Sequence, residues 1–471
     1  MRILMVSAEA YPLASTGGLA GVVGSLPGAL AGAGHRVAVA MPFYGDIDLP
    51  GEPEWLPGSF RTPMGEEFGV ARTFLPGTEC PVFLIGRSPL FDRDGLYGPR
   101  PGEVWPDNSL RFAFFCRSVL PLLSRVFPAD VVHCHDWHAG LVPAYLRDSG
   151  PATVTTIHNL AFQGRFPPED YHVAGLPPEL YNPEGIEFWG SWSFLKAGIV
   201  WADMVTTVSP TYAEEIQTPG MGYGLDGVLR SRSGSLEGVL NGIDYRAWDP
   251  SADPALVAGF SAESIPGRRR CAAWLRREMG IGDGVDVLAG MVGRLTPQKG
   301  VDLVLEAAPR LLDEGVGLAV LGTGHRKLEE GMRDLEERYP GRVGVRIDYD
   351  DTMARRIFAG SDLFLMPSRF EPCGLGQMMA MRYGAVPVVR STGGLADTVT
   401  DLGRDPVGNG FCFGPATAPA LESAVLRAAG VRRSRRWPWL VKRCMREDSS
   451  WSGRSGAYLD VYRRALAGRV D

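Results

Sequence analysis

Short runs of apolar residues alternate along the chain with longer stretches in which apolar residues recur at helical spacing. In the first half, such runs predict buried β-strands at residues 3–8, 36–41, 130–133, 153–157 and 204–208. After the first of them, residues 19–30 have the spacing of an amphipathic helix and follow a glycine-rich turn. Because runs without polar interruptions are typical of strands buried on both faces, we predict a parallel sheet covered by helices on both sides.

The same pattern begins again in the second half of the chain. A second set of strands is predicted at residues 287–292, 318–321, 343–347, 363–366 and 386–389. The sequence therefore predicts an α/β protein of two Rossmann-like, doubly wound domains. Since such sheets bind ligands at the carboxyl ends of their strands, we expect the two domains to face each other across a deep cleft that holds the chemistry.

The division of the chain follows from these patterns. Residues 449–466 have apolar positions at helical spacing and predict a terminal amphipathic helix. Residues 249–266, which contain prolines and serines, are the expected hinge region. We therefore expect three parts, namely residues 1–240, 241–448 and 449–471.

Composition and charge narrow the class of protein. The 471 residues are 45% hydrophobic and 22% charged, which is typical of a globular protein, and the net charge of −6 argues against a nucleic-acid partner. No apolar run is long enough to span a bilayer. The seven cysteines are scattered and odd in number, which favours a reducing, cytoplasmic location.

The first glycine cluster lies between the first strand and the first helix. Backbone N–H groups at Ser15, Gly17 and Gly18 can bind a phosphate or sugar oxygen there. An NAD-binding turn would have the spacing G-x-G-x-x-G and an acidic residue at the end of the second strand. Here the glycines are adjacent and the second strand ends in Met41-Pro42, so an NAD-dependent oxidoreductase is disfavoured.

Two cations and a carboxylate follow strands of the second half. Arg294 and Lys299 come directly after its first strand and can neutralise the phosphate of a departing nucleoside diphosphate, although solvated surface charges are the alternative. Glu371 can stabilise positive charge at an anomeric carbon, or it merely complements a helix dipole. After the next strand, Thr392 and Gly393 offer backbone amides to oxygen anions.

Histidines gather in two short stretches of the first half. His133, His135 and His138 lie close to Asp136, and His158 follows the next strand, so a metal site must be considered. However, consecutive side chains of a strand point to opposite faces, which disfavours a closed tetrahedral zinc site. We expect no metal, either here or at the acidic pair formed by residues 348 and 350.

Read in order, these segments resemble the bacterial glycogen synthase and plant starch synthase family along essentially the entire chain. The resemblance rests on the motifs at residues 7–12, 16–19, 136–140, 158–160, 240–244, 293–300, 369–375 and 392–397. It implies a GT-B fold, a metal-independent transfer of glucose with retention from ADP-glucose to the non-reducing end of an α-1,4-glucan, and a C-terminal helix that crosses back to the first domain. UDP-glucose as donor, or another acceptor, is the open alternative.

The resemblance also implies roles for individual residues. The catalytic residues would be His158, Arg294, Lys299 and Glu371. The donor would be bound by Ser15, Gly17, Gly18, Asn241, Tyr349, Cys373, Gly374, Leu375, Thr392 and Gly393, with Tyr349 stacked on the adenine. The wall of the first domain would contribute Glu9, Asp136 and His138 near the acceptor and the donor sugar.

Three positions depart from the family pattern. Ser15 stands where the family typically has lysine, Gly21 where it has aspartate, and Gly376 where it has threonine. A hydrogen bond to a charged group contributes roughly 1.5 to 3 kcal/mol, so loss of the lysine alone implies a donor site about ten- to a hundred-fold weaker. A catalytically impaired glucan-binding protein is therefore a further alternative.

Overall fold

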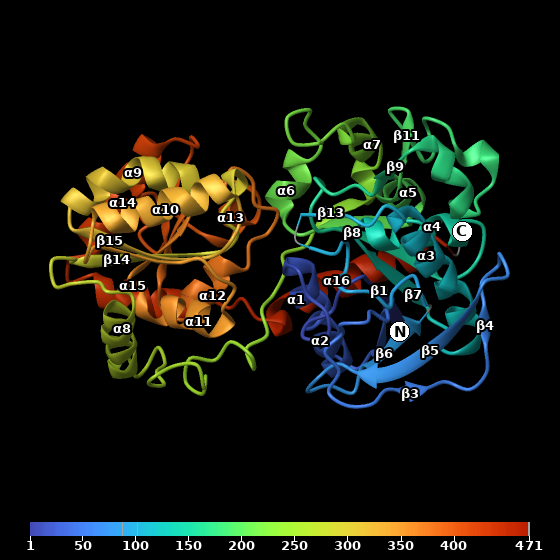
Figure 1. Ribbon diagram of the computed structural model, residues 1–471, viewed down its shortest axis with the longest axis horizontal. Coiled ribbons are helices and arrows are strands. Elements are labelled where there is room, and N and C mark those ends of the chain that lie inside the picture. The colour runs from blue at the N-terminus through green and yellow to red at the C-terminus, as the bar shows by residue number, and fades with distance from the viewer. Residues whose placement is uncertain (87, 101, 470–471) are drawn as a thin grey trace. The chain divides into compact units, whose positions relative to one another are not determined.

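The computed structural model describes residues 1–86, 88–100 and 102–469, and they form two compact units (Figure 1). Unit 1 comprises Met1–Gly242 and the C-terminal segment from Trp451, and unit 2 comprises Ile243–Ser450. Each boundary lies two residues beyond the position expected from the sequence. The expected hinge at residues 249–266 lies wholly within unit 2, so that expectation was wrong. The hinge was expected because residues 249–266 contain prolines and serines. However, part of this segment packs into unit 2, where Phe260 is buried.

Unit 1 is built on a large sheet with the strand order β13-β12-β8-β7-β1-β2-β6-β5-β3, with β4 paired to β5. Its strands are β1 (Arg2–Val6), β2 (Arg36–Pro42), β3 (Glu54–Trp55), β4 (Phe60–Arg61), β5 (Glu67–Phe74), β6 (Pro81–Gly86), β7 (Val131–His135), β8 (Ala152–Ile157), β12 (Met204–Thr207) and β13 (Leu236–Gly238). All five strands predicted in the first half are present and pair in parallel. The prediction omitted β6, although it is apolar, and the antiparallel strands β3 to β5, whose exposed residues interrupt the apolar pattern.

The helix predicted over residues 19–30 is in fact two helices. Helix α1 (Gly18–Val23) ends at Gly24, and α2 (Leu26–Gly32) begins after Ser25. A Cβ at Gly24 would lie 2.3 Å from the carbonyl oxygen of Tyr11, so the chain approaches its own backbone where the helix breaks. The apolar pattern continues through this break because both helices bury one side against the sheet.

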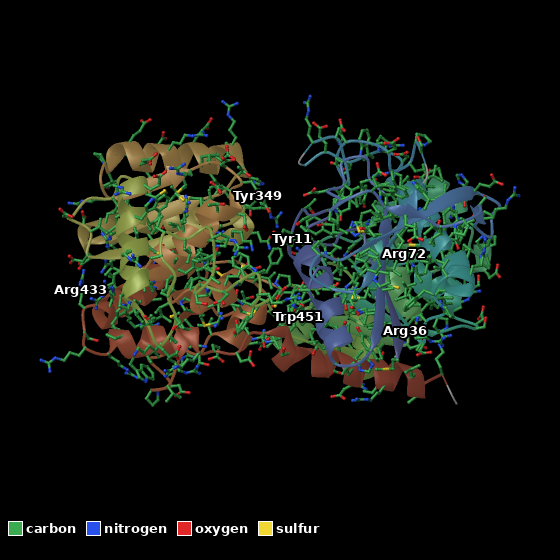
Figure 2. The ribbon with its side chains drawn as sticks, turned by 90° about the horizontal axis from the view of Figure 1, so that it is seen from below. Tyr11, Arg36, Arg72, Tyr349, Arg433 and Trp451 are labelled. Atoms are coloured by element: carbon green, nitrogen blue, oxygen red, sulfur yellow. The ribbon has the colours of Figure 1, made fainter. Side chains whose placement is uncertain are left out.

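The remaining helices of unit 1 include the C-terminal one. They are α3 (Asn108–Arg125), α4 (Val142–Leu146), α5 (Phe194–Trp201), α6 (Pro210–Glu215), α7 (Asp226–Ser231) and α16 (Trp451–Ala467). Trp451, labelled in Figure 2, donates from its indole nitrogen to the Ser25 hydroxyl at 2.7 Å. Tyr458, Val461 and Tyr462 of α16 are fully buried, so this helix belongs to the core of unit 1. The last two residues of the expected segment 449–471 lie outside the described residues.

A small antiparallel sheet and its loops complete unit 1. It has the order β10-β11-β9, formed by β10 (Glu187–Phe188), β11 (Ser191–Ser193) and β9 (Arg165–Phe166). Strand β9 follows β8 after a short loop, so this sheet lies close in the chain to the carboxyl end of β8.

Unit 2 is a parallel sheet with the order β16-β15-β14-β17-β18-β19 and helices on both faces (Figure 1). Its strands are β14 (Val287–Val292), β15 (Val316–Leu321), β16 (Val343–Arg346), β17 (Leu363–Met366), β18 (Val386–Arg390) and β19 (Phe411–Phe413). One face carries α9 (Val301–Asp313), α10 (Arg326–Arg338) and α14 (Ala418–Arg432). The other carries α8 (Pro266–Glu278), α11 (Asp351–Gly360), α12 (Gly376–Arg382) and α15 (Trp437–Met445), and α13 (Gly393–Thr398) follows β18. All five predicted strands are confirmed.

Among the described residues, the helices offer no stretch with the length and apolar character that crossing a membrane requires.

Candidate active site

In unit 2, the predicted residues gather at the carboxyl ends of three adjacent strands. The segment after β14 carries Arg294 and Lys299, the segment after β17 carries Glu371, and the segment after β18 carries Thr392 and Gly393. Because β14, β17 and β18 are neighbours in the sheet, these segments meet at one edge. This is the edge at which parallel α/β sheets bind ligands.

Lys299 and Glu371 form the centre of this cluster. The Lys299 ammonium lies 2.6 Å from Oε2 of Glu371, and the Ser368 hydroxyl donates to the same oxygen at 2.9 Å. The Glu371 side chain is 8% exposed and that of Lys299 is 22% exposed. A carboxylate bonded in this way is fixed in orientation, and the ammonium above it remains accessible to a bound anion.

The segment that carries Lys299 is attached to the segment that carries Glu371. Lys299 ends a short 3-10 helix (Pro297–Lys299), and the backbone of Gln298 accepts from the N–H of Arg369 at 2.8 Å. Arg369 also forms an ion pair with Asp302 at 2.6 Å. A Cβ at Gly300 would lie 2.2 Å from the carbonyl oxygen of Pro367, so only glycine allows this approach. These backbone contacts hold the segment that carries Lys299 against the segment that carries Glu371.

Arg294 is linked to the same cluster through Gln298. Its guanidinium donates to the Gln298 side chain at 3.4 Å, and that side chain donates to the carbonyl oxygen of Phe370 at 3.3 Å. Arg294 itself is exposed. The structure thus brings the two predicted cations and the predicted carboxylate to one edge of the sheet.

The glycines after β18 pack against the backbone of the Glu371 segment. Gly393 has a φ of +44°, and a Cβ there would lie 2.1 Å from the carbonyl oxygen of Glu371. A Cβ at Gly394 would lie 2.2 Å from the carbonyl oxygen of Cys373. The adjacent glycines are therefore required by contact with the chain, in addition to any role of their amides in binding a ligand.

The remaining predicted donor residues of unit 2 are less closely joined to this pair. The carbonyl oxygens of Cys373 and Gly374 accept from the Gln377 side chain, at 3.1 and 2.8 Å, and Leu375 precedes α12. Tyr349 is 85% exposed in the loop before α11, at the surface of unit 2 (Figure 2).

In unit 1, the candidate residues again follow adjacent strands. Glu9 comes after β1 and is buried, and its carboxylate accepts from the backbone N–H of Thr16 at 2.5 Å and from the Thr16 hydroxyl at 2.7 Å. The Tyr97 hydroxyl also donates to Glu9, at 2.5 Å. Glu9 thus holds the turn at residues 15–18, in which Ser15, Gly17 and Gly18 are exposed.

Asp136 connects the ends of β7 and β8. Its φ is +56°, and Oδ1 accepts from the backbone N–H groups of His158 at 2.7 Å and Asn159 at 3.4 Å. Burial raises the pKa of Asp136 to about 7, although these two N–H groups favour the charged form, and the nearby Glu9 raises the pKa further. Asp136 therefore fixes the backbone at His158 and is itself close to half ionised at neutral pH.

His158 lies in a row of buried imidazoles. Its Nε2 is 3.0 Å from Nδ1 of His135, so one ring donates and the other accepts. His133 is bonded to Tyr462 of α16 at 2.9 Å and to Thr156 at 2.6 Å. Burial lowers the pKa values of His133 and His158 to about 3, and the pKa of His135 falls well below its usual value for the same reason. His158 is therefore a neutral, oriented imidazole.

No trio of histidine, cysteine or acidic side chains in the described part of the chain has the geometry to hold a metal ion. Of the acidic pair after β16, Asp350 caps α11 by accepting from the N–H of Met353 at 2.9 Å. That carboxylate therefore has a structural role.

His138 and Asn241 are both buried in unit 1. The ring of His138 stacks on Tyr97 with the centroids 4.6 Å apart, and burial lowers its pKa well below the usual value. Asn241 was expected in the second domain but belongs to unit 1, and its backbone oxygen accepts from Arg454 of α16. Its side-chain oxygen is buried without a hydrogen-bond partner among the described residues.

Sequence reasoning missed three residues that orient the candidates. Tyr97 lies 88 positions from Glu9, and no motif marks it. Ser368 supports Glu371 from three positions upstream. His135 was considered only as a metal ligand, because its contact with His158 depends on the register that places it opposite Thr156. Register between strands was the signal that the sequence did not provide.

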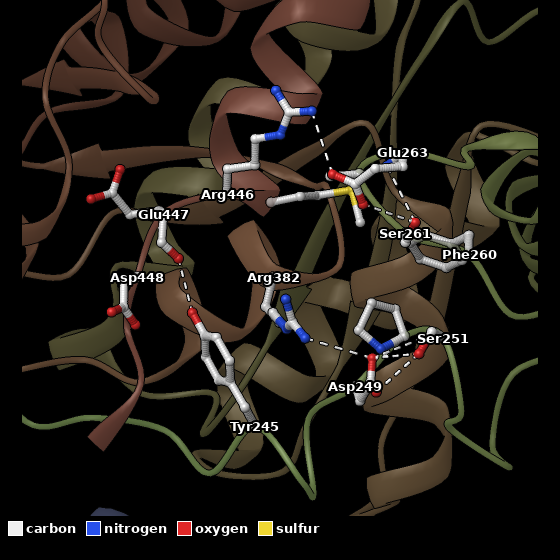
Figure 3. Close-up of a pocket in the computed structure, with 13 residues that line it drawn as sticks. Tyr245, Asp249, Ser251, Phe260, Ser261, Glu263, Arg382, Arg446, Glu447 and Asp448 are labelled. Atoms are coloured by element: carbon white, nitrogen blue, oxygen red, sulfur yellow. Dashed lines mark hydrogen bonds and ion pairs between the residues drawn. The ribbon is translucent and has the colours of Figure 1, made fainter. Parts of the chain in front are cut away.

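A separate cavity of about 420 Å³ in unit 2 does not contain these residues. Figure 3 shows two ion pairs in its lining, Arg382 with Asp249 at 3.6 Å and Arg446 with Glu263 at 3.4 Å. It lies between the start of unit 2 and the end of α15, away from the carboxyl ends of β14 and β17. We therefore assign the candidate site to the strand ends.

The chain matches two known family models. Residues 2–231 match the model of the starch synthase catalytic domain, and residues 286–430 match the model of glycosyl transferases group 1. The fold is also that of the catalytic domain of starch synthase IV from Arabidopsis thaliana bound to ADP and acarbose, with a TM-score of 0.90, 32% identity and 99% of each chain covered. The predicted GT-B fold class is confirmed, and the chain is a glycosyltransferase.

Similarity to curated bacterial proteins specifies the family. The chain is 47% identical to the glycogen synthase of Alkalilimnicola ehrlichii, with 98% of each chain covered. It is 46% identical to the glycogen synthase of Halorhodospira halophila, with 100% of each chain covered. The chain therefore belongs to the glycogen synthase family, as the resemblance of its motifs indicated.

Proposed function

We propose that this glycosyltransferase moves glucose from ADP-glucose to the non-reducing end of an α-1,4-glucan, with retention of configuration and without a metal ion. Its curated relatives are glycogen synthases, and the Arabidopsis neighbour was solved with ADP. ADP is the group that ADP-glucose would release. The proposal includes no nucleic-acid or membrane partner, and the oligomeric state stays open.

The observation that carries the proposal is the Lys299–Glu371 pair at the carboxyl edge of the unit 2 sheet. Departure of a nucleoside diphosphate places negative charge on its terminal phosphate, and Lys299 with Arg294 supplies two fixed cations for it. Glu371 offers negative charge to the anomeric carbon of the transferred glucose, whose bond to the phosphate is breaking. The two fixed cations can neutralise the charge of the departing phosphate, as a metal ion does in other transferases.

The proposed reaction needs no nucleophile from the protein. The 4-hydroxyl oxygen of the acceptor bonds to the anomeric carbon on the face that the phosphate leaves, and the departing phosphate takes the hydroxyl proton. Consequently two catalytic carboxylates at glycosidase spacing are not required. Neutral His158 can bond to a sugar hydroxyl, and Asp136 fixes the backbone from which it projects.

We also propose that the protein works in the cytoplasm. All seven cysteines are free, and six of them are buried, which suits a compartment that keeps thiols reduced.

Incorporation of radiolabelled glucose into a glycogen primer tests the function. We expect transfer from ADP-glucose to exceed transfer from UDP-glucose, to persist in EDTA, and to disappear in Glu371→Gln. Glu422→Gln is the matched control, because Glu422 is also buried in unit 2 and paired with an arginine, Arg310, at 3.3 Å. Preference for UDP-glucose would reject the proposed donor, and loss of transfer in EDTA would reject the metal-free mechanism.

The alternative of an impaired glucan-binding protein is supported by the departures at Ser15, Gly21 and Gly376. At Gly376 a Cβ would lie 3.3 Å from a ring carbon of Phe364, so the threonine typical of the family would be tightly packed there. If the wild-type chain binds glycogen but transfers glucose from neither donor, this alternative replaces the proposed enzyme.

A further inference from the structure

Two exposed aromatic residues of unit 1 are held in a strained backbone conformation. Among the described non-glycine residues, positive φ angles occur at Asp136 (+56°), Trp189 (+52°) and Tyr223 (+49°). Asp136 belongs to the candidate site, whereas Trp189 is 78% exposed and Tyr223 is 42% exposed. This conformation is unfavourable for a bulky residue and persists only where the surroundings enforce it, so it often marks a functional position.

The conformation of Trp189 is enforced by the hairpin that it caps. Trp189 and Gly190 form the turn between β10 and β11, and the N–H of Gly190 donates to the Glu187 carboxylate at 2.7 Å. Beneath the turn, the buried ammonium of Lys196 donates to the carbonyl oxygens of Pro183 and Glu187, both at 2.5 Å. A buried cation is thus used to fix the hairpin that presents the indole ring.

Tyr223 lies beside this hairpin. Its carbonyl oxygen accepts from the Gln163 side chain at 3.0 Å. A Cβ at Gly224 would lie 3.3 Å from the indole nitrogen of Trp189, so the two turns are in contact. Gln163 in turn bonds through its own carbonyl oxygen to the hydroxyl of Ser193, at the end of β11.

The third ring, Phe162, lies on the loop that starts at His158. Phe162 is 54% exposed, and its N–H donates to the carbonyl oxygen of Asn159 at 3.1 Å. The loop is held at one end by the bond from the His158 N–H to Asp136, and at the other by Gly164, whose Cβ would lie 2.4 Å from the ring of Trp137. One short loop therefore joins the candidate reaction centre to the surroundings of Tyr223 and Trp189.

We propose that Phe162, Trp189 and Tyr223 form an aromatic platform that binds the acceptor glucan. A pyranose ring presents an apolar face of C–H groups, which stacks on aromatic rings, and a backbone that is fixed before binding loses little conformational entropy when a sugar arrives. The platform lies on unit 1, as does His158, so a chain whose end reaches His158 can extend over it. The identity of the chain as an α-1,4-glucan rests on the proposed function.

Glycine substitutions test the platform without threatening the fold. Because glycine readily adopts a positive φ, Trp189→Gly and Tyr223→Gly remove a ring and relieve strain together. We expect each variant to bind maltoheptaose about ten-fold more weakly by calorimetry, which is the loss of one well-buried aromatic contact. The melting temperature should not fall, and the KM for ADP-glucose should be unchanged while the KM for glycogen rises.

Trp55→Ala is the matched control. Trp55 is 58% exposed in β3, at the edge of the large sheet opposite β13, and its loss should leave glucan affinity unchanged. If both glycine variants bind maltoheptaose within about two-fold of the wild type, the platform is rejected. The binding measurement requires neither donor nor turnover. A wild-type protein that transfers no glucose would therefore refute the proposed function and still leave the platform tested.

Discussion

The candidate residues of the two units differ in their charge states. In unit 2 the central pair is an ammonium and a carboxylate 2.6 Å apart at the end of the sheet. In unit 1 the corresponding strand ends bury His138 and His158, and burial keeps these imidazoles uncharged. Six of the seven histidines lie in unit 1, and His325 alone lies in unit 2.

The difference corresponds to the two parts of the proposed donor. A diphosphate requires fixed positive charge, which is stable near solvent when a carboxylate holds it in place. A sugar is uncharged, and its hydroxyl groups can be oriented by neutral donors and acceptors such as imidazoles. The central pair of unit 2 is thus charged and the buried imidazoles of unit 1 are neutral, and the predictions below test the two units separately.

Removal of the unit 2 cation should have the largest effect. Lys299→Ala takes away the charge beside the departing phosphate and leaves the buried Glu371 without its partner, so we expect kcat to fall about 10²- to 10³-fold. The fall in kcat is measured from the steady-state rate of glucose transfer from ADP-glucose to glycogen. Lys327→Ala, on the exposed side of α10, is the control and should retain full activity. A loss of less than about ten-fold would show that Lys299 does not stabilise the leaving group.

Acid should destabilise unit 1 more than unit 2. The pKa values of His133 and His158 fall from 6.5 to about 3 on burial, so their contribution to stability is present above pH 6.5 and is lost as the pH falls towards 3. Each such histidine lowers the free energy of unfolding by about 1.4 kcal/mol per pH unit in that window. The contribution of Asp136 to stability changes with pH in the opposite direction. Its pKa is raised to about 7, so this contribution is lost as the pH rises through 7.

Hydrogen exchange followed peptide by peptide between pH 7 and pH 5 measures this asymmetry. Protection should decrease in β7 and β8 before it decreases in β14 and β17. His133→Gln should reduce the pH dependence, whereas replacement of the exposed His172 should leave it unchanged. Equal loss of protection in both units would show that the buried imidazoles do not control acid stability.

The same contrast explains which features the sequence could predict. The ten predicted strands are apolar runs that are mostly buried, although β16 at the edge of its sheet ends in the exposed Arg346, so the apolar pattern alone identified them. Lys299 and Glu371 were identified because each follows such a strand, and the carboxyl ends of parallel strands meet at one edge. Continuous patterns and strand ends are local signals, and in unit 2 they identified β14 to β18 and the central pair, but not β19 or Ser368.

Unit 1 depends on contacts that local signals do not encode. The pairing of His135 with His158 follows from the register of β7 against β8, and the bond from Tyr97 to Glu9 joins distant parts of the chain. These features required coordinates because their cause lies in tertiary packing.

A lysine at position 15 would add a positive charge to the candidate residues of unit 1, which would reduce the difference in charge between the two units. Ser15 is exposed in the turn at residues 15–18 that Glu9 holds, and it is one of the three departures from the family pattern expected from the sequence. We expect Ser15→Lys to lower the KM for ADP-glucose about ten-fold, as a new hydrogen bond to a phosphate oxygen would. Ser15→Gln has a similar reach without the charge and should change the KM little. An unchanged KM in the lysine variant would show that this turn does not contact the diphosphate.

Tyr97→Phe should have the smallest effect, because it removes one hydrogen bond from unit 1 and keeps the ring that stacks on His138. Glu9 would retain its two bonds to Thr16, so the turn should loosen without collapsing. We expect kcat/KM to fall about three- to ten-fold, equivalent to about 1 kcal/mol. Tyr44→Phe is the control, since the Tyr44 hydroxyl is buried with no hydrogen-bond partner within the described residues. Its removal should leave activity unchanged and stability equal or higher. If the two variants have the same kcat/KM, Tyr97 supports Glu9 only by packing, and the orientation of Glu9 does not depend on the Tyr97 hydroxyl.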